Sequence, residues 1–101
     1  MNVKTEQNAT AFIASLSGNL AFSDNPAFRK LLEEMNESDA KRWVLDLSNL
    51  ASVDSAGLGM FIVAMEYSKK ASASLVLRSP NGHVKNLIEL SNMDQLIQVE
   101  A

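Results

Sequence analysis

The chain has 101 residues, 47% hydrophobic and 21% charged, a composition typical of one globular domain with a single modest core. Its net charge is −3 and no basic cluster stands out, so neither nucleic-acid binding nor a polybasic membrane anchor is expected. Cysteine is absent, which excludes disulfides, thiolate metal sites and a thiol nucleophile and is in keeping with a reducing cytoplasm. The longest unbroken apolar run, Met60 to Met65, falls far short of the ~20 residues that span a bilayer, so direct membrane insertion is not expected.

The first part of the chain predicts two strands and a helix. Residues 3–7 form a possible first strand, and residues 10–17 alternate in the manner of a second. Ser23 or Asp24 is expected to cap the helix that follows. Its apolar stripe, with helical spacing, consists of Phe28, Leu31, Leu32 and Met35.

The rest of the chain alternates strands with helices. The expected segments are a strand over Arg42–Leu47, a helix over Ser55–Lys70, a strand over Ser74–Leu77, a helix over His83–Leu90 and a strand over Leu96–Val99. The resulting order is β-β-α-β-α-β-α-β. It predicts a single α/β domain over residues 1–101, with a mixed, largely parallel sheet and helices packed on it.

The stretch VDSAGLG, residues 53–59, opens the second helix in an unusual way. Asp54 or Ser55 could cap it, yet one cap would suffice and both residues are present. Gly57 and Gly59 each cost about 1 kcal/mol relative to alanine in a helix interior. Close packing of the helix on the sheet would account for the glycines, and so would the approach of a ligand or protein to this turn.

The same helix carries two apolar faces. One face, expected to pack on the sheet, consists of Leu58, Phe61, Ile62 and Met65. The opposite face consists of Ala56, Met60, Val63 and Tyr67. Because a domain of this size has little material to cover a second face, we predict that it binds a partner. Cover from within the domain is the alternative.

Several other kinds of site are disfavoured, and we expect no cofactor, no metal and no catalytic residue. A dinucleotide-binding fingerprint would need a third glycine where Ile62 stands, and no P-loop is present. His83 is the only histidine, so it cannot complete a zinc site with a second imidazole. A hydrolase elbow around Ser55 would need glycine where Val53 stands.

Residues 44–64, VLDLSNLASVDSAGLGMFIVA, resemble the signature of the STAS domain, in particular that of bacterial anti-sigma-factor antagonists. The family pattern is a strand ending in D-x-S, a short loop, and D-S-[SA]-G-L-G at the start of a helix. The matching residues are Asp46, Ser48, Asp54, Ser55, Gly57, Leu58 and Gly59. The resemblance extends to SGNL at 17–20 and to residues 84–99, nearly the whole chain.

The resemblance implies a regulatory cycle. An unphosphorylated antagonist binds an anti-sigma factor, often one with a histidine-kinase-like ATPase fold, and so frees the sigma factor. That serine kinase, or a related one, then phosphorylates the serine that corresponds to Ser55 and ends the binding, and a PP2C-type phosphatase resets the switch. In this interpretation the chain is a substrate and not an enzyme. The expected partner-binding residues are Asp54, Ser55, Ala56, Gly57, Met60, Val63 and Tyr67.

The chain departs from the family pattern at one position. Family members often carry an acid directly after the early glycine-x-leucine, near the phosphorylated serine. Here Ala21 follows Leu20, and the nearest acid is Asp24. Some relatives serve as non-phosphorylated subunits of transport or signalling assemblies, so a constitutive STAS adaptor is the alternative function.

Overall fold

The computed structural model describes all residues, Met1 to Ala101. Its elements are β1 (Asn2–Gln7), β2 (Ala11–Leu20), a 3-10 turn η1 (Phe22–Asp24), α1 (Asn25–Glu37), β3 (Arg42–Val53), α2 (Ser55–Lys70), β4 (Ser74–Arg78), α3 (Gly82–Leu90), η2 (Met93–Gln95) and β5 (Gln98–Glu100). This order of strands and helices confirms the predicted one. None of the helices combines the length and the apolarity needed to cross a membrane.

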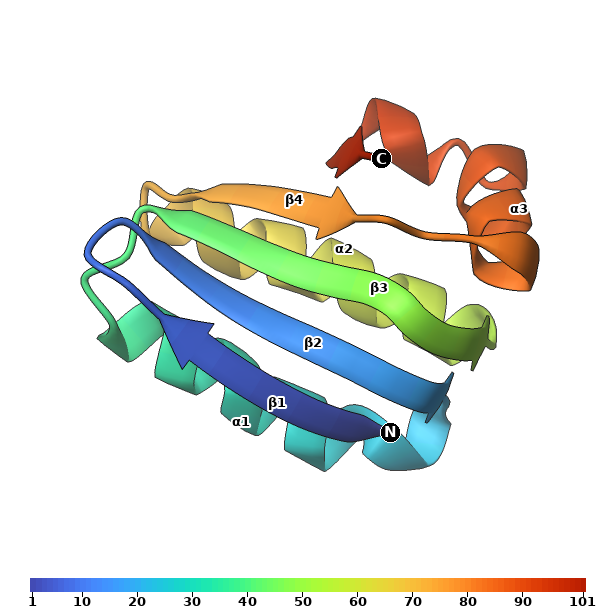
Figure 1. Ribbon diagram of the computed structural model, residues 1–101, viewed down its shortest axis with the longest axis horizontal. Helices are drawn as coiled ribbons and strands as arrows, with labels where there is room; N and C mark the ends of the chain where they lie inside the picture. The colour runs from blue at the N-terminus through green and yellow to red at the C-terminus, as the bar shows by residue number, and fades with distance from the viewer.

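The five strands form one sheet in the order β1-β2-β3-β4-β5. β1 is antiparallel to β2, and all other neighbours are parallel. In Figure 1, α1 and α2 lie side by side behind the sheet, whereas its front face carries no helix. Strand residues of the main core that alternate along β2, β3 and β4 include Phe12, Ala14, Leu16, Trp43, Leu45, Leu47, Leu75 and Leu77, and Leu20, Leu50 and Val53 extend the core to the ends of β2 and β3.

The apolar stripe predicted for α1 is confirmed. All of its members are buried, namely Phe28, Leu31, Leu32 and Met35. Each belongs to the same core cluster as the strand residues behind which α1 lies. The stripe is unambiguous because the opposite side of α1 is charged, so only one face can pack on the sheet.

β3 continues to Val53, well beyond its predicted end at Leu47. Its pairing with β2 persists through two register shifts to the pair Leu20↔Val53. The extension alternates buried residues, Leu50 and Val53, with polar or exposed ones, and β4 pairs with β3 only as far as Asp46. A strand paired on one side only has no continuous apolar signal, so its sequence resembles a loop. Its effect is to bring Leu20 beside the start of α2.

The packing face of α2 differs in part from the predicted one: Phe61 is buried as predicted, but Leu58, Ile62 and Met65 are only partly buried against the core. The buried residues of the helix are Gly57, Met60, Phe61, Ala64 and Ser68. Met60 is only 4% exposed and belongs to the core, whereas Leu58, Ile62 and Met65 are partly exposed. Small side chains explain the choice, because Gly57, Ala64 and Ser68 let the helix backbone approach the sheet closely. The Ser68 hydroxyl can be buried because it donates to the Met65 carbonyl at 2.7 Å.

The packing of α2 predicts different stabilities for two methionine variants of this helix. Met60→Ala should lower the free energy of unfolding by about 2–5 kcal/mol, the usual cost of truncating a core side chain. Met65→Ala, the matched control, should cost about 1 kcal/mol or less because its side chain is already partly in water. Urea melts of both variants measure the difference, and equal losses would contradict the packing described for α2.

Candidate functional site

The start of α2 is held by the carboxylate of Asp54. Asp54 Oδ1 accepts a hydrogen bond from the Gly57 backbone N–H at 2.8 Å, which caps the helix. Asp54 Oδ2 accepts from the Phe22 backbone N–H at 3.3 Å, and the Asp54 backbone N–H donates to the Leu20 carbonyl at 3.2 Å. One residue therefore joins the end of β2, the turn η1 and the first turn of α2.

Ser55 is free of that structural task. It is the first residue of α2, it is exposed, and its hydroxyl takes no part in the hydrogen bonds that form the cap. Of the two predicted caps, Asp54 is therefore the one in use. The arrangement leaves Ser55 as an accessible hydroxyl at the positive end of a 16-residue helix.

Glycine is required by internal packing at only one of its two positions in the first turns of α2. A Cβ on Gly57 would lie 2.8 Å from the Leu20 carbonyl oxygen and 2.7 Å from Val53 Cγ1, so internal packing requires glycine there. A Cβ on Gly59 would meet nothing within 4 Å. Gly59 lies four residues after Ser55 and so on the same face of the helix. Because Gly59 has no side chain, the helix backbone next to Ser55 is partly exposed.

The other predicted partner-binding residues do not form one exposed surface. Gly57 and Met60 are buried, so their assignment to an accessible surface is wrong. Ala56, Val63 and Tyr67 are partly buried on the flank of α2. Val63 and Tyr67 line a groove of about 530 Å³ between α1 and α2, which is otherwise polar and is also lined by Arg29, Asn36, Glu66 and Lys70.

An exposed aromatic residue without a clear signal in the sequence is hydrogen-bonded through its backbone to Asp54, the residue before the serine. Phe22 is 74% exposed and belongs to η1, whose backbone Asp54 holds. Its signal in the sequence is weak, since a single phenylalanine just before a helix indicates neither a core nor a surface position. Only the pairing of the ends of β2 and β3 brings Phe22 next to the start of α2.

Asp24 is engaged within η1 and does not cap α1. Asp24 Oδ2 accepts from the Ala21 N–H at 2.9 Å, and Oδ1 lies 3.2 Å from the Met1 amine. The hydrogen bond from Ala21 is the main reason that the pKa of the Asp24 carboxyl is below its usual value. The acid nearest to the family's acidic position thus stabilises the turn that carries Phe22.

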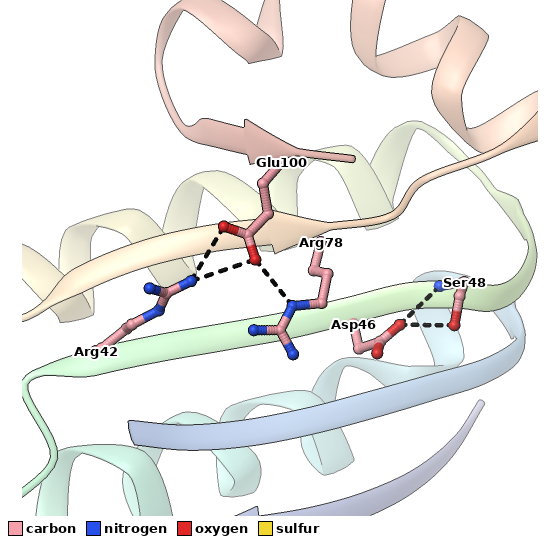
Figure 2. A network of polar contacts seen from close by, with 5 residues as sticks. All are labelled: Arg42, Asp46, Ser48, Arg78 and Glu100. Atoms are coloured by element: carbon pink, nitrogen blue, oxygen red, sulfur yellow. Dashed lines mark hydrogen bonds and ion pairs between the residues drawn. The ribbon is translucent and has the colours of Figure 1, made fainter. Parts of the chain in front are cut away.

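A second polar cluster lies on the helix-free face of the sheet (Figure 2). Glu100 binds Arg42 at 3.1 Å and Arg78 at 2.9 Å, and so ties β5 to β4 and β3. The hydrogen bond from the Arg78 guanidinium is the main reason that the pKa of the Glu100 carboxyl is below its usual value.

The D-x-S motif forms a local ring of hydrogen bonds on β3. Asp46 Oδ1 accepts from both the backbone N–H and the hydroxyl of Ser48. This local ring lies where β3 shifts register, so the D-x-S motif shapes the strand.

The glycine geometry predicts opposite effects of two alanine substitutions. Gly57→Ala should destabilise the fold by about 1–3 kcal/mol, because the new methyl group overlaps a backbone carbonyl that cannot rotate away. Gly59→Ala should be neutral or stabilise by up to about 1 kcal/mol, since alanine favours the helix and has room. Thermal melts of the two proteins test this, and a stable Gly57→Ala protein would contradict the close approach to Leu20.

The division of roles between the two residues at the cap is also testable. Asp54→Ala should cost about 0.5–2 kcal/mol, because the Gly57 N–H loses its acceptor. Ser55→Ala should stay within about 0.5 kcal/mol of the original protein, as is usual for an exposed side chain without partners. Urea unfolding measures both values. A larger loss for Ser55→Ala than for Asp54→Ala would show that Ser55 is the structural residue.

A protein-family model and curated proteins match this chain over most of its length. A family model described as "Mlab, STAS domain" matches residues 3–98. A STAS-domain containing protein of Pseudomonas aeruginosa is 26% identical over 84 residues, which are 83% of this chain and 82% of the relative. The anti-sigma-B factor antagonist of Bacillus subtilis is 25% identical over 101 residues, 100% of this chain and 92% of the relative.

Solved structures agree in fold. A Thermotoga maritima protein matches with a TM-score of 0.87 at 21% identity, covering 98% of this chain and 86% of that one. The Bacillus cell fate determinant SpoIIAA in its phosphorylated form matches with a TM-score of 0.74 at 14% identity, covering 99% and 92%. With its five-stranded mixed sheet, its three helices and a family match over nearly its whole length, the chain belongs to the STAS-domain family.

Proposed function

We propose that the chain is an anti-sigma-factor antagonist, a protein-binding module that holds an anti-sigma factor and is switched off by phosphorylation of Ser55. The observation that carries this proposal is the exposed Ser55 at the start of α2, which its neighbour Asp54 relieves of the capping role. Relatives named anti-sigma-B factor antagonist in Bacillus subtilis and Staphylococcus aureus support it. So does the likeness in fold to SpoIIAA, whose structure is known in both unphosphorylated and phosphorylated forms.

The fold can accept a phosphate on Ser55 without rearrangement. Phosphorylation adds a charge of about −1.5 to −2, which the N-terminus of a helix stabilises. The Asp54 carboxylate opposes this charge locally, while its own hydrogen bonds to Gly57 and Phe22 hold the turn in place. The modification should therefore change what the surface can bind more than it changes the domain.

A phosphate on Ser55 would weaken the binding of a partner. A partner that covers Ser55 would have to remove water from a dianion. Leaving such a charge buried without a counter-ion costs about 2–5 kcal/mol, which weakens binding roughly 30-fold to several thousand-fold. The same site can thus release its partner on modification without unfolding.

The partner we propose is a cytoplasmic anti-sigma factor and serine kinase with a histidine-kinase-like ATPase fold, with a PP2C-type phosphatase that removes the phosphate. The resemblance to antagonists implies both. In this cycle the chain supplies a hydroxyl and a contact surface and performs no catalysis itself. Its role is that of a substrate and a competitor for the anti-sigma factor.

One observation favours a second function, that of a constitutive adaptor subunit in a transport or signalling complex. Ala21 takes the place of the family's acid, and Asp24, the last residue of η1, is held by the Ala21 N–H and the Met1 amine. A kinase that relies on an acid beside the serine would lack it here. An adaptor would use the same exposed surface without modification.

Three proteins distinguish the two functions, namely the original chain, Ser55→Asp and Ser55→Ala. We expect the original chain and Ser55→Ala to bind the kinase-like anti-sigma factor with ADP equally well. Ser55→Asp should bind it more weakly, because the added charge must be desolvated. Calorimetry gives the affinities. With ATP, intact-mass measurement should show about 80 Da added to the original chain and none to Ser55→Ala.

The matched control is Ser72→Asp, which adds the same charge just beyond the other end of α2, at an exposed position whose left-handed backbone aspartate tolerates. It should bind like the original chain. Equal affinities for all these proteins, together with no added phosphate on the original chain, would refute the switch and favour the constitutive adaptor.

A further inference from the structure

Phe22 stands out among the exposed apolar residues because of its position. The large apolar side chains with the highest exposure are Phe22, Leu90 and Leu96. A single exposed apolar side chain is ordinary on a protein surface. Leu90 and Leu96 lie at the end of α3 and just after η2, in the C-terminal part of the fold. Phe22 alone among them is joined to the residue that precedes Ser55.

That link is direct. The Phe22 backbone N–H and the Gly57 backbone N–H donate to the two oxygens of the Asp54 carboxylate. Ser55 follows Asp54 in the chain, so one hydrogen bond and one peptide link connect two exposed residues, Phe22 and Ser55. A protein that covers Ser55 can therefore also contact the exposed Phe22.

The turn that carries Phe22 is held in shape before any partner arrives. Asp24 Oδ2 accepts from the Ala21 N–H at 2.9 Å, and the Asp24 backbone N–H donates to the Ala21 carbonyl at 2.9 Å. A ring on such a turn loses little freedom when it is bound, which favours affinity. The first turns of α2 offer a partner less apolar contact area than Phe22 does, because Gly59 has no side chain and Met60 is in the core.

We propose that Phe22 is the apolar anchor of the surface around Ser55, and that its ring enters an apolar pocket of the kinase-like anti-sigma factor. This inference rests on the proposed function, since it concerns the same partner. Aromatic side chains near the centre of an interface commonly supply much of its binding energy.

The test is the affinity of Phe22→Ala for the anti-sigma factor with ADP, measured by calorimetry beside Ser55→Asp. Phe22→Ala should bind at least about thirtyfold more weakly, as is usual for a residue that dominates an interface. Phe22→Tyr, which keeps the ring, should restore most of the affinity. Leu96→Ala, in which another exposed side chain is truncated, should bind like the original chain.

The outcomes separate this inference from the proposed function. If Ser55→Asp binds weakly and Phe22→Ala binds normally, the anchor is wrong and the switch stands. If Phe22→Ala binds weakly and Ser55→Asp binds normally, the anchor stands and the switch is wrong. Normal binding by both variants refutes both. A lower urea midpoint for Phe22→Ala would also overturn the anchor, because a ring 74% exposed should not support the fold.

Discussion

The carboxylate of Asp54 is the interaction on which the functional end of this domain depends. Its two oxygens serve different segments, one the first turn of α2 and the other the turn η1. The parallel pairing of β2 with the extended β3 brings these segments together, since it ends at Leu20 and Val53. The carboxylate thus adds a side-chain link between the turn that carries Phe22 and the first turn of α2, which carries Ser55, to the backbone contacts at Leu20.

The STAS signature combines residues with distinct physical tasks. Asp46 and Ser48 form a local ring where β3 shifts its register, and Gly57 lets α2 approach Leu20. Asp54 caps the helix. Ser55 and Gly59 are members of the signature that make no contact required by the fold, so a change of the Ser55 side chain should leave the domain folded.

Periodicity predicted those parts of the fold in which one face is clearly apolar. The stripe of α1 contains Phe28 and Met35 and has a charged opposite side, so its burial followed from the sequence. In α2 both sides are apolar, and periodicity alone cannot rank them. The decision depends on size, because the side with Gly57 and Ala64 fits closer to the sheet. Phe22 could not be found from local sequence, since its neighbours at the site come from β3 and α2.

The narrow contact between α2 and the sheet also bears on how such a domain can diversify over evolutionary time. Positions 57, 64 and 68 hold small residues against the sheet, and larger ones there would overpack the interior. Positions 59, 62 and 66 lie on the outer side of the helix, at least partly exposed to water. A lineage can exchange these outer residues, and Phe22 with them, while the inner ones stay constant. New partner specificities can therefore arise on an unchanged scaffold.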